Sequence, residues 1–204
     1  MERRHKMEYI GDIIYDYGLY INMTNRCPCR CEFCIRNMVD SLGDADSLWL
    51  KREPTAEEVI SLLKEWDLKQ YKELVFCGYG EPMERLSDLL KISRYIKANT
   101  HLRIRINTNG LSDLIWERPI AAELEGLIDA VSISLNAASK EKYEALCHPI
   151  YGEEAYEGIL RFTKEVKGYV PEVILSVVGG AIPKEDVELC HKIAKDLQVK
   201  FRVR

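Results

Sequence analysis

Six predicted β-strands that alternate with predicted helices constrain the fold of this chain more than any other feature. Alternating apolar and polar residues, or short apolar runs, place these strands at residues 19–24, 74–76, 102–107, 130–136, 173–178 and 199–203. Strands that alternate with helices favour parallel β/α units. Six units are too few to close an eight-stranded β/α barrel, which takes about 250 residues. The sequence therefore predicts an α/β protein whose core is an open, partial (β/α)6 barrel of the TIM type.

The helices and connections follow the same pattern. A capping box, in which Thr55 and Glu58 bond to each other's backbone, predicts the start of the first helix. Apolar spacing predicts further helices over residues 86–98, 111–127, 154–166 and 183–197 and one after Ser139, with Pro119 interrupting the helix over 111–127. A short extra strand or hairpin is expected within residues 7–18. Connection 35–54 is long enough for a lid, but we favour a loop whose Trp49 packs on the adjacent helix.

The composition is that of a soluble globular protein. The chain has 204 residues, of which 47% are hydrophobic and 30% charged, and we expect one domain (1–204) with an N-terminal extension (1–18) and a core (19–204). We expect no membrane span, because no apolar run is long enough. No apolar signal core follows the charged N-terminus, so we predict a cytoplasmic protein with reduced thiols. A net charge of −4 gives no general attraction to nucleic acid.

Four of the seven cysteines lie within residues 27–34, on the loop that follows the first core strand. Cys27, Cys31 and Cys34 have the spacing C-x3-C-x2-C. Three thiolates can bind three corners of an iron–sulfur cube, and the fourth iron is then open to a substrate or cofactor atom. Two alternatives are a structural zinc site that also uses Cys29, which would be a strained cage on so short a span, and disulfides. Cys77, Cys147 and Cys190 are scattered and are interpreted as small buried residues.

A second motif follows the second core strand, where residues 76–82 have the sequence FCGYGEP. Gly78 and Gly80 allow a tight turn and a close approach to a ligand, and Glu81 adds a carboxylate. Together the two motifs resemble those of the radical S-adenosylmethionine (radical SAM) superfamily, whose cluster motif is C-x3-C-x-aromatic-C. Phe33 occupies the aromatic position. The second motif of the family is commonly Gly-Gly-Glu-Pro, and here Tyr79 separates the two glycines.

The resemblance implies a (β/α)6 core and two cofactors. Cys27, Cys31 and Cys34 would hold a [4Fe–4S] cluster, and its one-electron reduction would cleave SAM to a 5′-deoxyadenosyl radical that abstracts hydrogen from a substrate. An external donor of the flavodoxin or ferredoxin type would supply the electron. The positions that the resemblance assigns to SAM are Gly78, Tyr79, Gly80 and Glu81 for the methionine part, the Asn109–Gly110 turn, Ser134, Asn136 and Val178.

The wording of the motifs also resembles a narrower group, the radical SAM proteins associated with TatD-type nucleases. The matching residues are 24–29 (TNRCPC), 33–36 (FCIR), 134–137 (SLNA) and 201–204 (FRVR). Minimal cores of this size also resemble the activases that generate glycyl radicals on partner proteins, and the substrate could be a protein or a nucleotide. The remaining alternative is an iron–sulfur or zinc binding module without SAM chemistry.

Alternation along the strands separates an apolar face from a polar one. We expect the apolar residues to pack under the helices and the polar residues to face the barrel lumen. The lumen would then carry the cations Arg105, Arg202 and Arg204, while Arg103 and Lys200 would lie at the opposite, solvated end and pair with Glu172. Cations that are removed from water need anionic partners. We therefore expect a polar or anionic substrate, with an internal network of salt bridges as the alternative.

Overall fold

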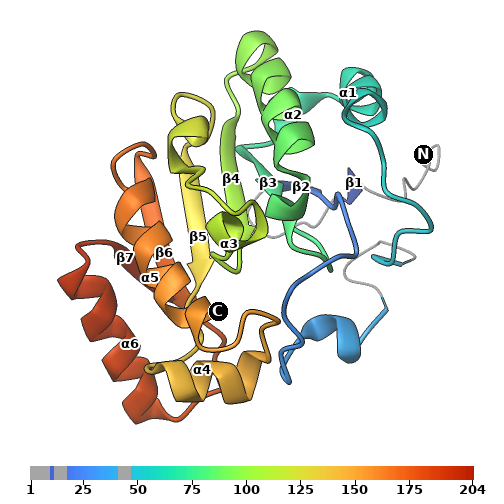
Figure 1. Ribbon diagram of the computed structural model, residues 1–204. Coiled ribbons are helices and arrows are strands. Elements are labelled where there is room, and N and C mark those ends of the chain that lie inside the picture. The colour runs from blue at the N-terminus through green and yellow to red at the C-terminus, as the bar shows by residue number, and fades with distance from the viewer. Residues whose placement is uncertain (1–9, 12–17, 41–46) are drawn as a thin grey trace.

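The structure is a computed structural model that describes residues 10–11, 18–40 and 47–204. Within these residues, one seven-stranded sheet has its strands side by side in chain order (Figure 1). The strands are β1 (Ile10–Gly11), β2 (Gly18–Ile21), β3 (Glu73–Phe76), β4 (Arg103–Thr108), β5 (Ala130–Ser134), β6 (Glu172–Val177) and β7 (Lys200–Val203). All neighbouring pairs from β2 to β7 are parallel, and β1 is antiparallel to β2. The partial (β/α)6 barrel is thus confirmed, and β1 is the extra strand expected before it.

Helices follow the strands and cover one face of the curved sheet (Figure 1). They are α1 (Ala56–Glu65), α2 (Leu86–Asn99), the short α3 (Ser112–Ile115), α4 (Lys140–Cys147), α5 (Glu154–Val166) and α6 (Lys184–Asp196). Single 3₁₀ turns occupy Ile35–Asn37, Leu68–Gln70, Pro82–Arg85 and Ala121–Leu124. The predicted capping box opens α1, because the Thr55 hydroxyl accepts from the Glu58 N–H at 3.2 Å and the Glu58 carboxylate accepts from the Thr55 N–H at 2.9 Å.

The helix predicted over residues 111–127 is interrupted around Pro119 as expected, but helical structure is limited to the four-residue α3 and a later 3₁₀ turn. Glu117 adopts a positive φ of 53°, and Pro119 has no N–H to continue a helix. The Asp113 carboxylate instead accepts a hydrogen bond from the Ile120 N–H at 3.1 Å, which closes the loop between the two turns. Ile120 and Leu124 are nevertheless buried four residues apart, so this part of the segment has a helix-like apolar spacing without a continuous helix.

The two faces of the strands differ in polarity as expected. The side chains that pack in the apolar core include Leu19, Ile21, Met23, Leu102, Ile104, Ile106, Val131, Ile133 and Leu135, with Val199 and Phe201 packed against it. Val203 departs from the prediction and is 50% exposed. At the amino ends of the strands, Glu172 pairs with both Arg103 and Lys200, as predicted. A cavity of about 660 Å³ borders this ion-paired cluster, at the end of the sheet opposite the cysteine loop. None of the helices in the described residues is both long and apolar enough to cross a membrane.

Candidate functional site

The cysteine loop joins two distant parts of the barrel. It begins where β2 ends and runs to the carboxyl end of α4, where three backbone hydrogen bonds hold it (Figure 1). Arg30 N–H donates to Cys147 at 2.9 Å, Glu32 N–H donates to Leu146 at 3.0 Å, and Ile150 N–H donates to Pro28 at 2.9 Å. The loop is therefore fixed on both sides at the carboxyl ends of the strands, the end at which β/α barrels carry their chemistry.

The four cysteines of the loop do not share one environment. Cys27, Cys31 and Cys34 are half-buried, whereas Cys29 is 2% exposed and belongs to the apolar core. The Cys29 Sγ lies 3.7 Å from the Tyr143 hydroxyl of α4. None of the seven cysteines, all of which lie in the described part of the chain, forms a disulfide. The loop therefore presents the three cysteines of the C-x3-C-x2-C spacing and withdraws the fourth.

The thiols of the loop interact with one another and with Cys147. Hydrogen bonds from Cys147 and Cys29 lower the pKa of Cys31 to about 4, and a hydrogen bond from Cys29 lowers the pKa of Cys27 to about 7. Burial raises the pKa of Cys34. Cys147 and Cys190 are buried as expected, and Cys77 is half-buried. The contact of Cys147 with Cys31 could not be inferred from the sequence, because the two residues lie 116 positions apart.

These cysteines fit an iron–sulfur cluster better than a single metal ion. A zinc ion needs four donors that converge on one point, at about 2.3 Å from each sulfur. Among the described residues, no three Cys, His, Asp or Glu side chains are arranged to hold one ion. A [4Fe–4S] cube makes no such demand, because each cysteine binds a different iron. Three presented thiols on one loop match that requirement.

The glycine loop after β3 lies directly against the cysteine loop. The Glu81 N–H donates to the Arg26 carbonyl at 2.8 Å. A Cβ atom on Gly80 would lie 2.2 Å from the Thr24 carbonyl oxygen, and one on Gly78 would lie 2.0 Å from Asn22 Oδ1. Real Cβ atoms do not approach other atoms so closely, so both positions require glycine. The two glycines therefore allow close packing of one loop on the other, whatever ligand they also face.

Glu81 is buried beneath this contact. Its carboxylate is 3% exposed and accepts hydrogen bonds from Thr108 Oγ1 at 2.7 Å, from the Asn109 N–H at 2.6 Å and from the Met83 N–H at 3.0 Å. Burial raises the pKa of Glu81 to about 8, and the nearby Cys27 acts in the same direction. The carboxylate thus ties the glycine loop to the end of β4, and all three of these donors belong to the protein itself.

Tyr79 joins the glycine loop to connection 35–54. Its side chain is buried, its hydroxyl donates to the Val39 carbonyl, and its ring meets the Trp49 ring edge-on with centroids 5.0 Å apart. The aromatic partner of Trp49 is therefore Tyr79 of the glycine loop, and the packing of Trp49 on the adjacent helix stays a prediction. Residues 41–46 of the connection lie outside the described residues, as do most of residues 7–18.

The other predicted site residues lie along the same edge of the sheet. Asn109 Nδ2 is 3.9 Å from Cys27 Sγ, and the Ser134 hydroxyl accepts from Arg204 Nη2 at 2.7 Å. Asn136 is buried with a positive φ of 54°, and Val178 directly follows β6 and is half-buried. Phe33, in the aromatic position of the cluster motif, packs against the core. The structure thus brings residues from four strand ends to the carboxyl end of the barrel. This end, which the cysteine loop borders, is the mouth of the barrel.

Residues 21–193 match the family model of the Radical SAM superfamily. The chain belongs to the radical SAM superfamily. Members of this superfamily are enzymes that use a [4Fe–4S] cluster and SAM and need an electron donor, so the membership implies these cofactors for this chain.

Curated relatives of this radical SAM chain are distant and longer. Molybdenum cofactor biosynthesis protein 1 of Dictyostelium discoideum is 24% identical over 188 residues, which cover 90% of this chain and 28% of the relative. A tungsten-containing aldehyde ferredoxin oxidoreductase cofactor-modifying protein of Pyrococcus furiosus is 27% identical over 88% of this chain and 47% of its own length. A GTP 3′,8-cyclase of Rhodopseudomonas palustris is 30% identical over 64% of this chain and 36% of its own. The chain thus spans less than half of each relative.

Solved structures share the fold. A radical SAM methyltransferase from Sphaerobacter thermophilus superposes with a TM-score of 0.62 at 19% identity, over 91% of this chain and 54% of that one. The structure described as native anSMEcpe with bound AdoMet gives a TM-score of 0.61 at 19% identity, over 90% of this chain and 50% of that one. At this identity the likeness establishes the radical SAM partial barrel fold.

The packing of the two loops predicts that Gly80→Ala destabilises the protein. The added methyl group would collide with two backbone carbonyl oxygens, at 2.2 Å for Thr24 and 2.7 Å for Arg26. Backbone cannot move aside as a side chain end can, so we expect the free energy of unfolding in urea to fall by about 1–3 kcal/mol. Gly158→Ala in α5 is the matched control, because its Cβ would meet only the flexible end of Leu114 and alanine favours a helix. Its free energy of unfolding should differ from that of the wild type by less than about 0.5 kcal/mol. Equal stability of Gly80→Ala and wild type would contradict the packing role.

The burial of Glu81 predicts a second loss of stability. Glu81→Ala leaves three donors without their acceptor, and each unsatisfied buried group costs about 1–3 kcal/mol. The free energy of unfolding in urea should therefore fall by at least about 2 kcal/mol. Glu81→Gln keeps one carbonyl oxygen and should lose less. Glu123→Ala removes an exposed carboxylate paired with Arg118 and should change stability by less than about 0.5 kcal/mol. A Glu81→Ala protein as stable as the Glu123→Ala protein would show that this carboxylate does not hold the loops.

Proposed function

We propose that this chain is a radical SAM enzyme in which Cys27, Cys31 and Cys34 bind the [4Fe–4S] cluster. The observation that carries the proposal is the presentation of these three thiols at the mouth while Cys29 lies in the core. When bound, the cluster and SAM supply a 5′-deoxyadenosyl radical for hydrogen abstraction, and the protein supplies orientation and seclusion. The proposed unit is the whole chain, residues 1–204, with residues 1–18 as an extension of the core.

The chain's own polar groups support a SAM site beside the cysteines. We assign it to the backbone of Gly78, Tyr79, Gly80 and Glu81 together with Asn109, Ser134, Asn136 and Val178. Asn109 already contacts Cys27, and the buried Asn136 Oδ1 has no hydrogen-bond partner among the described residues. An unsatisfied buried acceptor of this kind suits a ligand hydroxyl or ammonium donor. The role of the Glu81 side chain is to hold the loop, because its oxygens already accept from three protein donors.

The substrate proposed here is polar and anionic. Arg105 does not contribute to this proposal, because it is 7% exposed and pairs with Glu73 at 2.6 Å and with Asn107 at 2.7 Å. Arg105 is therefore part of an internal network of salt bridges, which was the alternative to a substrate role. Arg204 differs: its hydrogen-bonded side-chain partner is the neutral Ser134 hydroxyl. Desolvation lowers the pKa of Arg204; Cys77 acts in the opposite direction, and Arg202 and Arg105 act in the same direction as desolvation.

The relatives and the motifs suggest partners for this reaction. Several relatives are named GTP 3′,8-cyclase, and GTP is a polyanion, which agrees with a cation near the mouth. A flavodoxin- or ferredoxin-type donor would supply the electron. The narrower motif resemblance adds a functional link to a TatD-type nuclease, and a glycyl-radical activase acting on a partner protein is the second candidate function.

Cluster binding is tested by anaerobic reconstitution of cysteine variants with iron and sulfide. Cys31→Ala should retain little iron and release no 5′-deoxyadenosine from SAM under dithionite, because it removes one of three ligands. Cys29→Ala is the matched control, since it lies two residues away and points into the core. It should keep the wild-type iron content and brown colour. A cluster-free Cys29→Ala protein, or a colourless zinc protein, would contradict the assignment.

The substrate class is tested with GTP as the anionic probe. If the site accepts such an anion, GTP should increase the release of 5′-deoxyadenosine by the reconstituted protein. Arg204→Gln should reduce this increase about tenfold while release without GTP persists, because a charge-assisted contact is lost. Lys200→Gln is the control, since Lys200 starts the same strand and pairs with Glu172 at the opposite end. No response to GTP, or equal loss of both activities in Arg204→Gln, would contradict this substrate class.

A further inference from the structure

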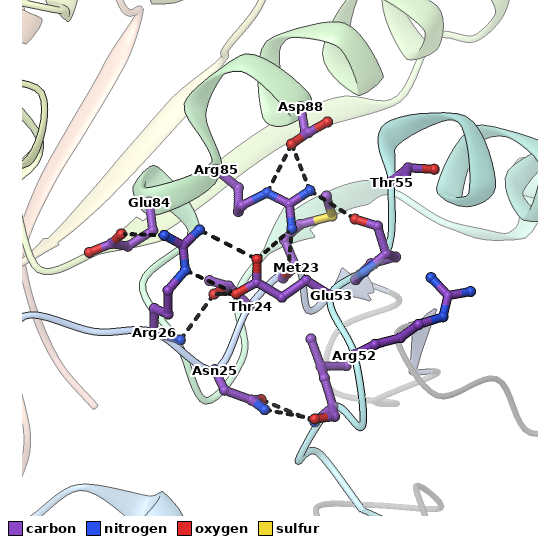
Figure 2. Close-up of polar contacts among 12 residues, drawn as sticks. Met23, Thr24, Asn25, Arg26, Arg52, Glu53, Thr55, Glu84, Arg85 and Asp88 are labelled. Atoms are coloured by element: carbon purple, nitrogen blue, oxygen red, sulfur yellow. Dashed lines mark hydrogen bonds and ion pairs between the residues drawn. The ribbon is translucent and has the colours of Figure 1, made fainter.

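A network of charged side chains surrounds the three residues that precede the first cluster cysteine (Figure 2). It joins segments that are far apart in the sequence: residues 23–26 after β2, the end of connection 35–54, and the turn into α2. None of these contacts was predicted from the sequence. Figure 2 shows that Glu53 and Arg85 lie at the centre of the network, with the other side chains arranged around them.

The Glu53 carboxylate is the link to the cysteine loop. It accepts hydrogen bonds from the Thr24 hydroxyl and from Arg26 Nε, the latter at 3.0 Å. Its second oxygen accepts from Arg85 Nη1 at 2.9 Å. Next to it, Asn25 makes two bonds to the backbone of Leu50, at 2.8 and 3.0 Å. The end of the connection is thus bonded to each of the three residues before Cys27.

Arg85 joins this assembly to the rest of the barrel. Its side chain is 14% exposed and donates from Nε to Asp88 at 2.8 Å, from Nη2 to the Pro54 carbonyl at 2.9 Å and from Nη1 to the Met23 carbonyl at 3.3 Å, in addition to its pair with Glu53. A planar guanidinium can bond in several fixed directions at once, which a lysine ammonium cannot reproduce. One side chain therefore sets the relative positions of β2, the connection and α2.

The opposite side of the same three residues is the glycine loop. The carbonyls of Thr24 and Arg26 face Gly80, and the Arg26 carbonyl accepts from the Glu81 N–H. Residues 24–26 therefore lie between two sets of contacts. On one side the glycine loop packs too closely to allow displacement, and on the other side the charged network of Glu53 and Arg85 binds them. The Arg26 side chain is 56% exposed, so its ion pair with Glu53 contributes little stability, whereas Arg85 and Glu53 are only 14% and 32% exposed. We expect the main effect of the network to be on local geometry, because its bonds converge on residues 23–26.

We propose that Glu53 and Arg85 are positioning residues that hold residues 24–26, and with them Cys27, against the glycine loop. The consequence for SAM affinity rests on the function proposed above, but the positioning itself does not. The removal of either residue should loosen one side of the cysteine loop and leave its attachment to α4 intact.

The test compares Glu53→Gln, Arg85→Lys and the control Glu57→Gln by hydrogen–deuterium exchange in cluster-free protein. Glutamine at position 53 keeps one carbonyl oxygen, which can accept from Thr24 and Arg26. Its amide nitrogen cannot accept the bond that the second carboxylate oxygen accepts from Arg85. Amides in residues 24–27 and the Glu81 amide should exchange about tenfold faster, while β5 amides should not change. Glu57 carries a similar ion pair to Lys91 between α1 and α2, away from the loop, so Glu57→Gln should behave as wild type.

The second measurement uses reconstituted protein. Glu53→Gln should keep the wild-type iron content and bind SAM about tenfold more weakly. Exchange of residues 24–27 at the wild-type rate in both Glu53→Gln and Arg85→Lys would overturn the positioning role. Faster exchange throughout the protein, β5 included, would also overturn it, because the network would then serve global stability. A third outcome is faster exchange confined to the cysteine loop in the variants, with no cluster uptake by the wild type. It would uphold the positioning role and overturn the proposed function, so the two failures are distinguishable.

Discussion

The site depends on the contact between two loops that leave neighbouring parallel strands. Gly80 lies against the Thr24 and Arg26 carbonyl oxygens at a distance that excludes any side chain, and the Glu81 N–H completes the contact at 2.8 Å. Because β2 and β3 are adjacent and in register, their ends bring the two loops together without a long connection. The location of Cys27 is therefore set by sheet pairing first and by loop chemistry second. A displacement of one loop would be transmitted to the other, since neither has space to absorb it.

Burial of the Glu81 carboxyl group beneath this contact disfavours its ionised form. Glu81 is held by three donors, which favour its ionised form, yet burial and Cys27 together raise its pKa to about 8. The desolvation effect therefore outweighs the hydrogen bonds. Arg105 shows the opposite balance: burial acts to lower its pKa, but the ion pair with Glu73 leaves that pKa raised. A buried arginine with a carboxylate partner is thus a satisfied part of the framework, whereas a cation with a neutral partner, such as Arg204, retains capacity for an anion.

Features that repeat along the chain or lie close together in it were predictable from the sequence. Alternation or short apolar runs located all six core strands to within about three residues at each end, and the spacing of Cys27, Cys31 and Cys34 distinguished them from Cys29, which is the buried one of the four. Apolar spacing overestimated the helix over residues 111–127: Ile120 and Leu124 are buried at a helical interval, but the chain forms only α3 before Pro119 and a 3₁₀ turn after it. Long-range partners could not be predicted. They depend on how segments that are far apart in the sequence pack together, which local sequence patterns do not specify. Examples are the pairs Trp49–Tyr79, Glu53–Arg85 and Cys31–Cys147.

The burial of Cys29 explains how a motif with four cysteines presents three. The loop passes from β2 to the carboxyl end of α4, and Cys29 lies within this second attachment, between Pro28 and Arg30 and beside Tyr143. Its thiol is small and apolar enough to enter the core, where a charged or larger side chain would force the loop outward. Cys27 and Cys31, two residues to either side, remain half-buried at the mouth. Cys29 therefore anchors the loop that carries the three proposed cluster ligands. Serine at position 29 would place a more polar group in the core than alanine would.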